Sequence, residues 1–182
     1  IFRCGAPEDV LDEETLRTLY DIHDGTFDLL LGSVELCGAA GESRVFVVPG
    51  AGRGAPCFRS LQKRGIPFSA GILQPGDVDS AVARTLAART FESEPFSPPS
   101  GQVIKSALAA VRTARCVVDA GSPLGPYNRE NLTLLQEADK AGVPALCLRA
   151  KPPEGLGAVR CFDTVRELMD AAAELCPARE KK

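Results

Sequence analysis

The chain of 182 residues has a single histidine, His23, and no Cys-x-x-Cys pair among its seven cysteines. One histidine is too few for the usual histidine-based zinc sites and argues against Cys–His or Ser–His catalysis. No Gly-Lys-Ser or Gly-Lys-Thr run follows a glycine-rich loop, so the sequence lacks a Walker A motif and is not expected to hydrolyse ATP itself. His23 is expected in a loop or facing solvent.

Long apolar runs are also missing. No stretch approaches the roughly 20 apolar residues that a membrane-spanning helix needs, and a net charge of −3 favours neither nucleic acid nor anionic lipid as a partner. Apolar residues make up 45% and charged residues 25% of the chain, as in ordinary globular proteins. An odd number of cysteines, several of them inside apolar runs, is typical of a reducing cytosol rather than of a disulfide framework. We therefore expect a cytoplasmic protein without membrane insertion.

Short β-rich runs alternate with helical patterns from residue 44 onward. Strands are expected at residues 44–48, 67–73, 90–94, 115–120, 143–149 and 158–162. Helices are expected at 56–64 and 128–141 and after the capping residues Asp77, Ser100 and Asp163. This alternation predicts right-handed βαβ units. The expected fold is α/β: a Rossmann-like, doubly wound, mainly parallel sheet of five or six strands with helices on both faces.

Four segments are expected along the chain. Residues 1–25 form two short helices, the second capped by Asp12. Residues 26–42 are a connector in which 34–36 is a candidate extra strand. Residues 43–176 form the Rossmann-like domain, and residues 177–182 are a disordered tail.

The first candidate site is the glycine-rich loop at residues 49–56, between the first strand and its helix. Its glycines allow a close approach to a ligand, and amide groups at a helix N-terminus attract an anion. Gly50, Gly52, Arg53 and Gly54 are the candidate ligand-binding residues, with Arg53 as a contact for phosphate or carboxylate. The loose Gly-x-Gly-x-x-Ala spacing leaves a dinucleotide as an alternative, and a tight strand–helix turn without any ligand as another.

Two further loops are expected beside it. If the strand order is 3-2-1-4-5, the connections of the first and fourth strands diverge there, and such a switch point is where these folds bind ligands. The loop after the fourth strand supplies the candidates Asp119, Gly121, Ser122, Gly125, Tyr127 and Asn128. The loop after the second strand supplies Asp77, which together with Asp79 could hold a hydroxyl group or a cation. Structural alternatives remain for each residue. Asp119 could only cap backbone amides, and Asn128 could be an ordinary N-cap. Asp77 and Asp79 could stand in the first turn of a helix only because the helix dipole favours negative charge there.

Cys57 lies in the first turn after the glycine-rich loop. A helix dipole there lowers the pKa of a thiol, which would favour a reactive or metal-binding cysteine. The alternative, a small buried side chain that fills the core, is preferred.

The run Gly-x-Pro-Glu-x-Val-Leu at residues 5–11, followed by a helix ending in Leu19-Tyr20, resembles the tail of the ATP-binding subunits of ABC importers for iron–siderophore, haem and cobalamin. Residues 46–73 and 77–96 resemble a C-terminal extension of some of these subunits, through the glycine-rich loop, an Arg-x-Leu-Gln helix at 59–62 and a Gly-Ile-Leu strand end. The asparagines of the turn at 128–131 fit this resemblance as well. The resemblance implies an accessory domain at the inner face of the cell membrane. Its partners would be an ATPase domain of the same polypeptide, which alone binds ATP, and through that domain a permease.

Three functions remain open from the sequence. The first is a non-catalytic ligand-binding or regulatory domain that takes a small anionic ligand, such as a nucleotide or a corrinoid, at the switch-point crevice. The second is an enzyme acting on a nucleotide or phosphorylated small molecule, with Asp119, Asp77 and Asp79 as its only nearby carboxylates. The third is a dimerisation module. The sequence favours the first because it shows no convincing catalytic set of residues.

Overall fold

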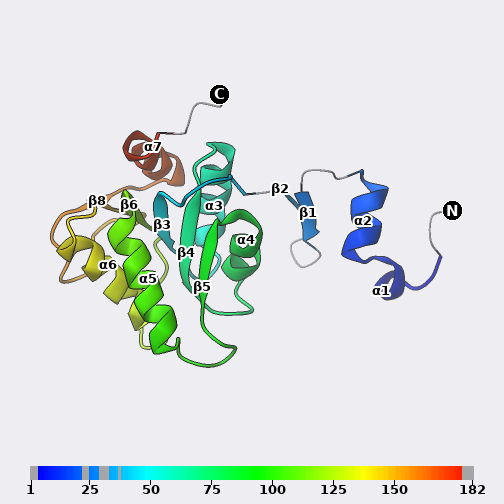
Figure 1. The fold of residues 1–182 in the computed structure, drawn as a ribbon, viewed down its shortest axis with the longest axis horizontal. Helices are drawn as coiled ribbons and strands as arrows, with labels where there is room; N and C mark the ends of the chain where they lie inside the picture. The colour runs from blue at the N-terminus through cyan, green and yellow to red at the C-terminus, as the bar shows by residue number, and fades with distance from the viewer. Residues whose placement is uncertain (1–3, 22–24, 29–32, 37, 178–182) are drawn as a thin grey trace. The chain divides into compact units, whose positions relative to one another are not determined.

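The computed structural model describes residues 4–21, 25–28, 33–36 and 38–177, and the chain divides into two units, Ile1–Cys37 and Gly38–Lys182 (Figure 1). Two helices of the first unit are described, α1 (Pro7–Val10) and α2 (Glu13–Leu19). Asp12 caps α2 as expected, because its Oδ1 accepts a hydrogen bond of 2.6 Å from the backbone N–H of Thr15.

Part of the expected connector at residues 26–42 forms regular structure. Strands β1 (Gly25–Asp28) and β2 (Ser33–Leu36) pair antiparallel within the first unit, with Gly25 opposite Leu36. The extra strand considered at 34–36 is thus one arm of this pair. His23 and the tail residues 178–182 lie outside the described residues.

The second unit is built on a six-stranded parallel sheet with the order β5-β4-β3-β6-β7-β8. Its strands are β3 (Val45–Val48), β4 (Phe68–Leu73), β5 (Arg89–Glu92), β6 (Cys116–Asp119), β7 (Ala145–Cys147) and β8 (Val159–Cys161). The α/β Rossmann-like fold is confirmed. The strand order is 3-2-1-4-5 in sequence order, which is the condition set for a switch point, and the sixth strand lies at the edge beyond the fifth.

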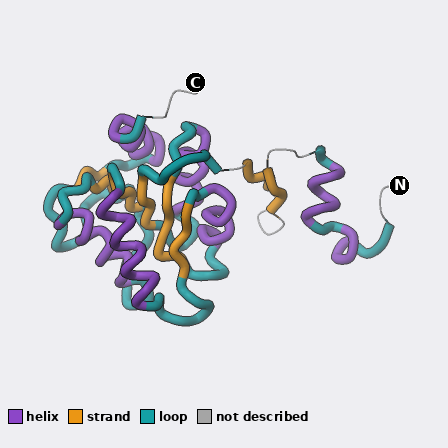
Figure 2. Tube along the Cα trace, in the orientation of Figure 1, coloured by secondary structure: helices purple, strands orange, loops and turns teal. Residues whose placement is uncertain are grey.

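Helices cover both faces of this sheet (Figures 1 and 2). They are α3 (Gly54–Lys63), α4 (Val78–Leu86), α5 (Gly101–Thr113), α6 (Arg129–Lys140) and α7 (Val165–Leu175). Helices α3, α4 and α7 lie on one face, and α5 and α6 on the other. The chain changes face between β5 and β6, so the helices that follow β3 and β6 leave the sheet in opposite directions.

Helix ends mostly agree with the sequence, with two differences. Helix α3 begins two residues before the expected start, which places Pro56 in its first turn, where a missing N–H costs nothing. The cap of α7 is Thr164 rather than Asp163: its Oγ1 accepts from the N–H of Glu167 at 3.2 Å and donates to the Glu167 carboxylate at 2.8 Å. Ser100 and Asp77 cap α5 and α4 as expected.

The core occupies both faces of the central strands. Phe46 and Val48 of β3 point towards α5 and α6, where they pack with Val117 and Leu134. All four residues of β3, six of β4 and four of β6 are buried. Burial on both faces explains why these strands read as continuous apolar runs rather than as alternating patterns. No helix among the described residues has both the length and the apolar character to cross a membrane.

Candidate functional site

A hollow of about 320 Å³ opens at the carboxyl edge of the sheet, among the loops that follow β3, β4 and β6. It is lined by Pro49, Gly50, Ala51, Ile72, Gln74, Asp77, Pro123, Leu124, Gly125, Tyr127, Asn128 and Asn131. Because α3 and α6 leave β3 and β6 towards opposite faces, the hollow lies at the topological switch point. We refer to it as the switch-point hollow.

The structure brings some of the expected site residues together there and leaves others out. Five of them line the hollow: Gly50, Asp77, Gly125, Tyr127 and Asn128. Six are absent from its lining: Gly52, Arg53, Gly54, Asp119, Gly121 and Ser122. Arg53, the expected anion contact, is exposed at the N-cap position of α3.

The amides of the glycine-rich loop are occupied by a carboxylate of the protein itself. Asp79, fully buried in the first turn of α4, accepts hydrogen bonds from the N–H groups of Gly50 at 2.8 Å, Gly54 at 2.9 Å and Ala55 at 2.8 Å. These are the donors that the sequence assigned to an anionic ligand. An internal carboxylate therefore takes the anion position at the N-terminus of α3.

Asp77 completes this arrangement from the edge of the hollow. Its Oδ2 accepts from the N–H of Ala51 at 2.8 Å, and its Oδ1 caps α4 by accepting from the N–H of Asp79 at 3.1 Å. Burial raises the pKa of the Asp79 carboxyl above its usual value, the three backbone hydrogen bonds oppose the rise, and the nearby Asp77 adds to it.

Asp119 is fully buried and is paired with Arg149 at the end of β7. The Nε of Arg149 lies 2.5 Å from Oδ2 of Asp119, and Nη2 lies 3.2 Å from Oδ1. The N–H of Gly121 also donates to Oδ1, at 2.9 Å. Asp119 thus caps a backbone amide, one of the alternatives weighed from the sequence. Arg149 was not among the candidate site residues expected from the sequence. A basic residue at the end of the strand next to Asp119 could have indicated this ion pair.

Gly121 is a glycine for steric reasons. Its φ is +79°, and a Cβ at this position would lie 2.3 Å from the backbone oxygen of Leu148. The loop after β6 consequently passes close against the end of β7, which holds Asp119 and Arg149 together.

Two asparagines fix the walls of the hollow. Asn131, 3% exposed, accepts from the N–H of Ile72 at 3.0 Å and donates to the carbonyl of Pro49 at 3.2 Å, so it links the ends of β4 and β3. Asn128 accepts from the N–H of Gly125 at 2.7 Å and donates to the carbonyl of Pro123 at 2.7 Å. Asn128 sits at the N-cap position of α6, but its side chain stabilises the loop instead of capping the helix. The structural role of Asn131 was missed; its signal was a polar side chain among the apolar positions of α6.

Cys57 does not behave as a reactive thiol. It is fully buried, and burial first, then the charges of Asp79 and Asp119, raise its pKa to about 12. The lowering expected from the helix dipole is wrong, because desolvation and two nearby carboxylates outweigh it. Cys57 is a buried core side chain, as the preferred alternative held.

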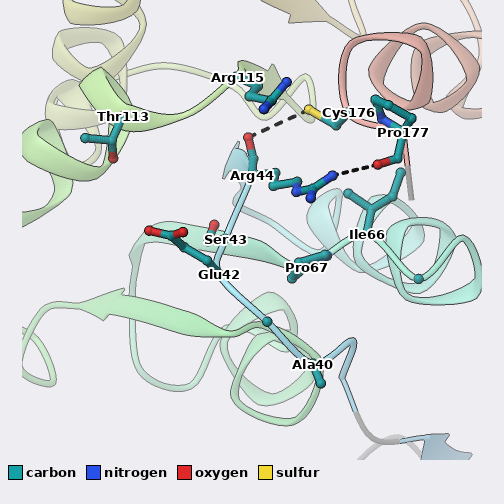
Figure 3. Close-up of a pocket in the computed structure, with 12 residues that line it drawn as sticks. Ala40, Glu42, Ser43, Arg44, Ile66, Pro67, Thr113, Arg115, Cys176 and Pro177 are labelled. Atoms are coloured by element: carbon teal, nitrogen blue, oxygen red, sulfur yellow. Dashed lines mark hydrogen bonds between the residues drawn. The ribbon is translucent and has the colours of Figure 1, made fainter. Parts of the chain in front are cut away.

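A second hollow, of about 230 Å³, lies at the opposite, amino edge of the sheet (Figure 3). Arg44 and Arg115 line it, and Nη1 of Arg44 donates to the carbonyl of Pro177 at 2.7 Å. Cys176 follows α7, with its Sγ 3.8 Å from that of Cys116. The hydrogen bond with Cys116 lowers the pKa of the Cys176 thiol, burial opposes this, and the charges of Arg115 and Arg44 lower the pKa further. These contacts fasten the end of α7 to the starts of β3 and β6.

A family model, that of the MJ0874 family, matches residues 68–180, more than half of the chain. The chain belongs to the MJ0874 family. The match runs from β4 to beyond α7, so it includes Asp77 and the loop after β6 but begins after the glycine-rich loop. No curated protein matches the chain.

Among solved structures, this MJ0874-family chain is similar to a chain from work on the structural basis for the mechanism and regulation of Sir2 enzymes. The identity is 12% and the TM-score 0.44; the match covers 68% of this chain and 66% of the other, just under two thirds of its length. A likeness of this degree carries no argument about function.

The resemblance to ABC importers is wrong. The family that matches is the MJ0874 family, and this match does not indicate an ABC transporter ATPase or the transport of iron–siderophore, haem or cobalamin. The same finding removes the reason for expecting an ATPase domain and a permease as partners.

Proposed function

We propose that the second unit is a ligand-binding, regulatory domain that takes a small molecule in the switch-point hollow without transforming it. The observation that carries this proposal is the position of the hollow. Loops after three neighbouring strands, β4, β3 and β6, surround about 320 Å³ of space at the one place where the helical connections diverge.

The walls are pre-organised for binding. Asn131 joins the ends of β3 and β4, and Asn128 closes the loop that follows β6. Side chains and loops that are already ordered lose little conformational entropy when a ligand arrives. This supports a site that exists before the ligand binds.

The enzyme alternative receives less support. It needs a carboxylate free to move a proton, but Asp79 and Asp119 are fully buried and bonded to backbone amides, and Asp119 is also paired with Arg149. Of the three expected carboxylates, only Asp77 reaches the hollow. A general acid or base has to lie within hydrogen-bond reach of the substrate.

Gly125 offers a direct way to fill the hollow. It belongs to the lining, and a Cβ added there meets no atom within 4 Å, so the Gly125→Leu side chain starts in open space. Gly101, at the start of α5, is equally open and is absent from the lining, so Gly101→Leu is the matched control.

The experiment is a thermal-shift screen of the whole chain against neutral, cationic and anionic small molecules, followed by calorimetric titration of each hit. A ligand at 100 times its dissociation constant stabilises the fold by about 2.7 kcal/mol. We expect Gly125→Leu to weaken binding at least tenfold and Gly101→Leu to leave it unchanged. Binding that Gly125→Leu leaves intact, or a screen without any hit, would overturn the proposal.

A further inference from the structure

We propose that the switch-point hollow selects a cationic ligand with an apolar face, such as an aromatic amine, over an anionic ligand of the same shape. This inference rests on the proposed function and gives the ligand a chemical class. It departs from the anionic ligand expected from the glycine-rich loop.

The first argument is that the donors an anion needs are already used. The N–H groups of Gly50, Gly54 and Ala55 donate to Asp79, and that of Ala51 donates to Asp77. A phosphate or carboxylate ligand would have to displace one of these side chains. It would also approach two carboxylates of its own sign, which disfavours it electrostatically.

The second argument is the charge of the lining. Among the described residues that line the hollow, only Asp77 is charged. An ionised carboxylate offers about four acceptor positions. Asp77 uses two of them, for Ala51 and Asp79, and is half-buried at the edge of the hollow. The remaining positions suit an ammonium group, and a charge-assisted hydrogen bond there is stronger than a neutral one.

The third argument is the apolar surface around this carboxylate. Pro49, Ile72 and Leu124 line the hollow, and Tyr127 is 93% exposed in the loop after β6. A large exposed aromatic side chain beside a hollow provides a surface for a flat ring and a face for a cation. Together these groups match a ligand with an aromatic ring at one end and an amine at the other.

Three probes of one shape separate charge from size: tryptamine, a cation; tryptophol, which is neutral; and indole-3-acetate, an anion. Each is titrated into the intact chain and followed by calorimetry or by ligand-observed NMR. We expect tryptamine to bind at least about tenfold more tightly than indole-3-acetate, with tryptophol between them, as one charge-assisted hydrogen bond implies. Equal or tighter binding of indole-3-acetate would overturn the inference.

Asp77→Asn tests the origin of the preference. Asparagine is also a good N-cap, so α4 keeps its cap while the charge is lost. We expect the variant to bind tryptamine and tryptophol alike. Added salt offers a second test on the unmodified chain. It should weaken the binding of tryptamine and leave the binding of tryptophol unaffected, because salt screens charges. A preference for tryptamine that survives both changes contradicts the role of Asp77.

The two proposals fail in different ways. If the probes bind and Gly125→Leu abolishes binding, but the anion is preferred, the hollow is a ligand site and only the charge selectivity is wrong. If other compounds of the screen bind and Gly125→Leu weakens them, but none of the three probes binds, only the inference about the ligand class is wrong. If the whole screen gives no hit, or if Gly125→Leu makes no difference to binding, the switch-point hollow is not the site and both proposals fall.

Discussion

Replacing Asp79 with alanine tests whether an internal carboxylate holds the glycine-rich loop. The substitution removes the acceptor for the backbone N–H groups of Gly54 and Ala55, whose hydrogen bonds are buried, and of Gly50, whose bond is partly buried. We expect the free energy of unfolding to fall by about 3 kcal/mol, because buried N–H groups lose their hydrogen-bond acceptor.

A buried donor left without a partner costs about 1–3 kcal/mol, so the two buried N–H groups together cost about 2–6 kcal/mol. The N–H of Gly50 lies closer to solvent and can donate a hydrogen bond to water instead. Against this loss stands a gain, because Asp79 no longer has to be buried as a charge, and burial is the main reason that its pKa is raised. The net loss therefore belongs in the lower half of the range.

The assay is urea denaturation followed by far-ultraviolet circular dichroism at neutral pH. Asp163→Ala is the control: Asp163 is exposed and, since Thr164 caps α7, its loss should change stability by less than about 0.5 kcal/mol. Inorganic phosphate should restore part of the stability of Asp79→Ala and leave the unmodified chain unaffected, because the vacated amides at a helix N-terminus bind anions. An Asp79→Ala variant as stable as the control would refute the reasoning.

Two further predictions concern other buried groups. Arg149→Ala should lower the free energy of unfolding by about 3 kcal/mol in the same denaturation assay, because it leaves the buried Asp119 carboxylate without its cationic partner; a loss under about 1 kcal/mol would show that the ion pair is dispensable. Iodoacetamide at pH 8 should modify the exposed Cys4 and spare Cys57, whose pKa of about 12 and burial leave almost no thiolate. Peptide mass spectrometry measures both cysteines, and equal modification would contradict the burial of Cys57.

Some elements were readable because their signals are local. The β-branched, apolar run at 45–48 predicted a strand buried on both faces, and Asp12, Asp77 and Ser100 each stand just before the helix they cap. The choice between Asp163 and Thr164 was not local. Both are good capping residues, and the path by which the chain enters α7 decided for Thr164.

In the first unit the strand pairing left no clear sign in the sequence. Residues 25–36 carry no strong alternation of apolar and polar residues, so the pairing of β1 with β2 was hidden. The resemblance to an importer subunit misled in a similar way: short runs such as residues 5–11 are too brief to fix a family, whereas the MJ0874 family match extends over 68–180.

By itself the sequence determined the parallel sheet with helices on both faces, because the alternation of apolar strands and amphipathic helices can be read from neighbouring residues. The strand order entered only as a condition, and the structure met it. Only the tertiary structure decided how the site is filled. Asp79 follows β4 and the glycine-rich loop follows β3, and these parallel neighbours end at one edge, so a carboxylate 25 residues away reaches the amide of Gly54. A hydrogen bond between residues so far apart in sequence leaves no local pattern, and this one replaced the expected anion with a side chain of the protein.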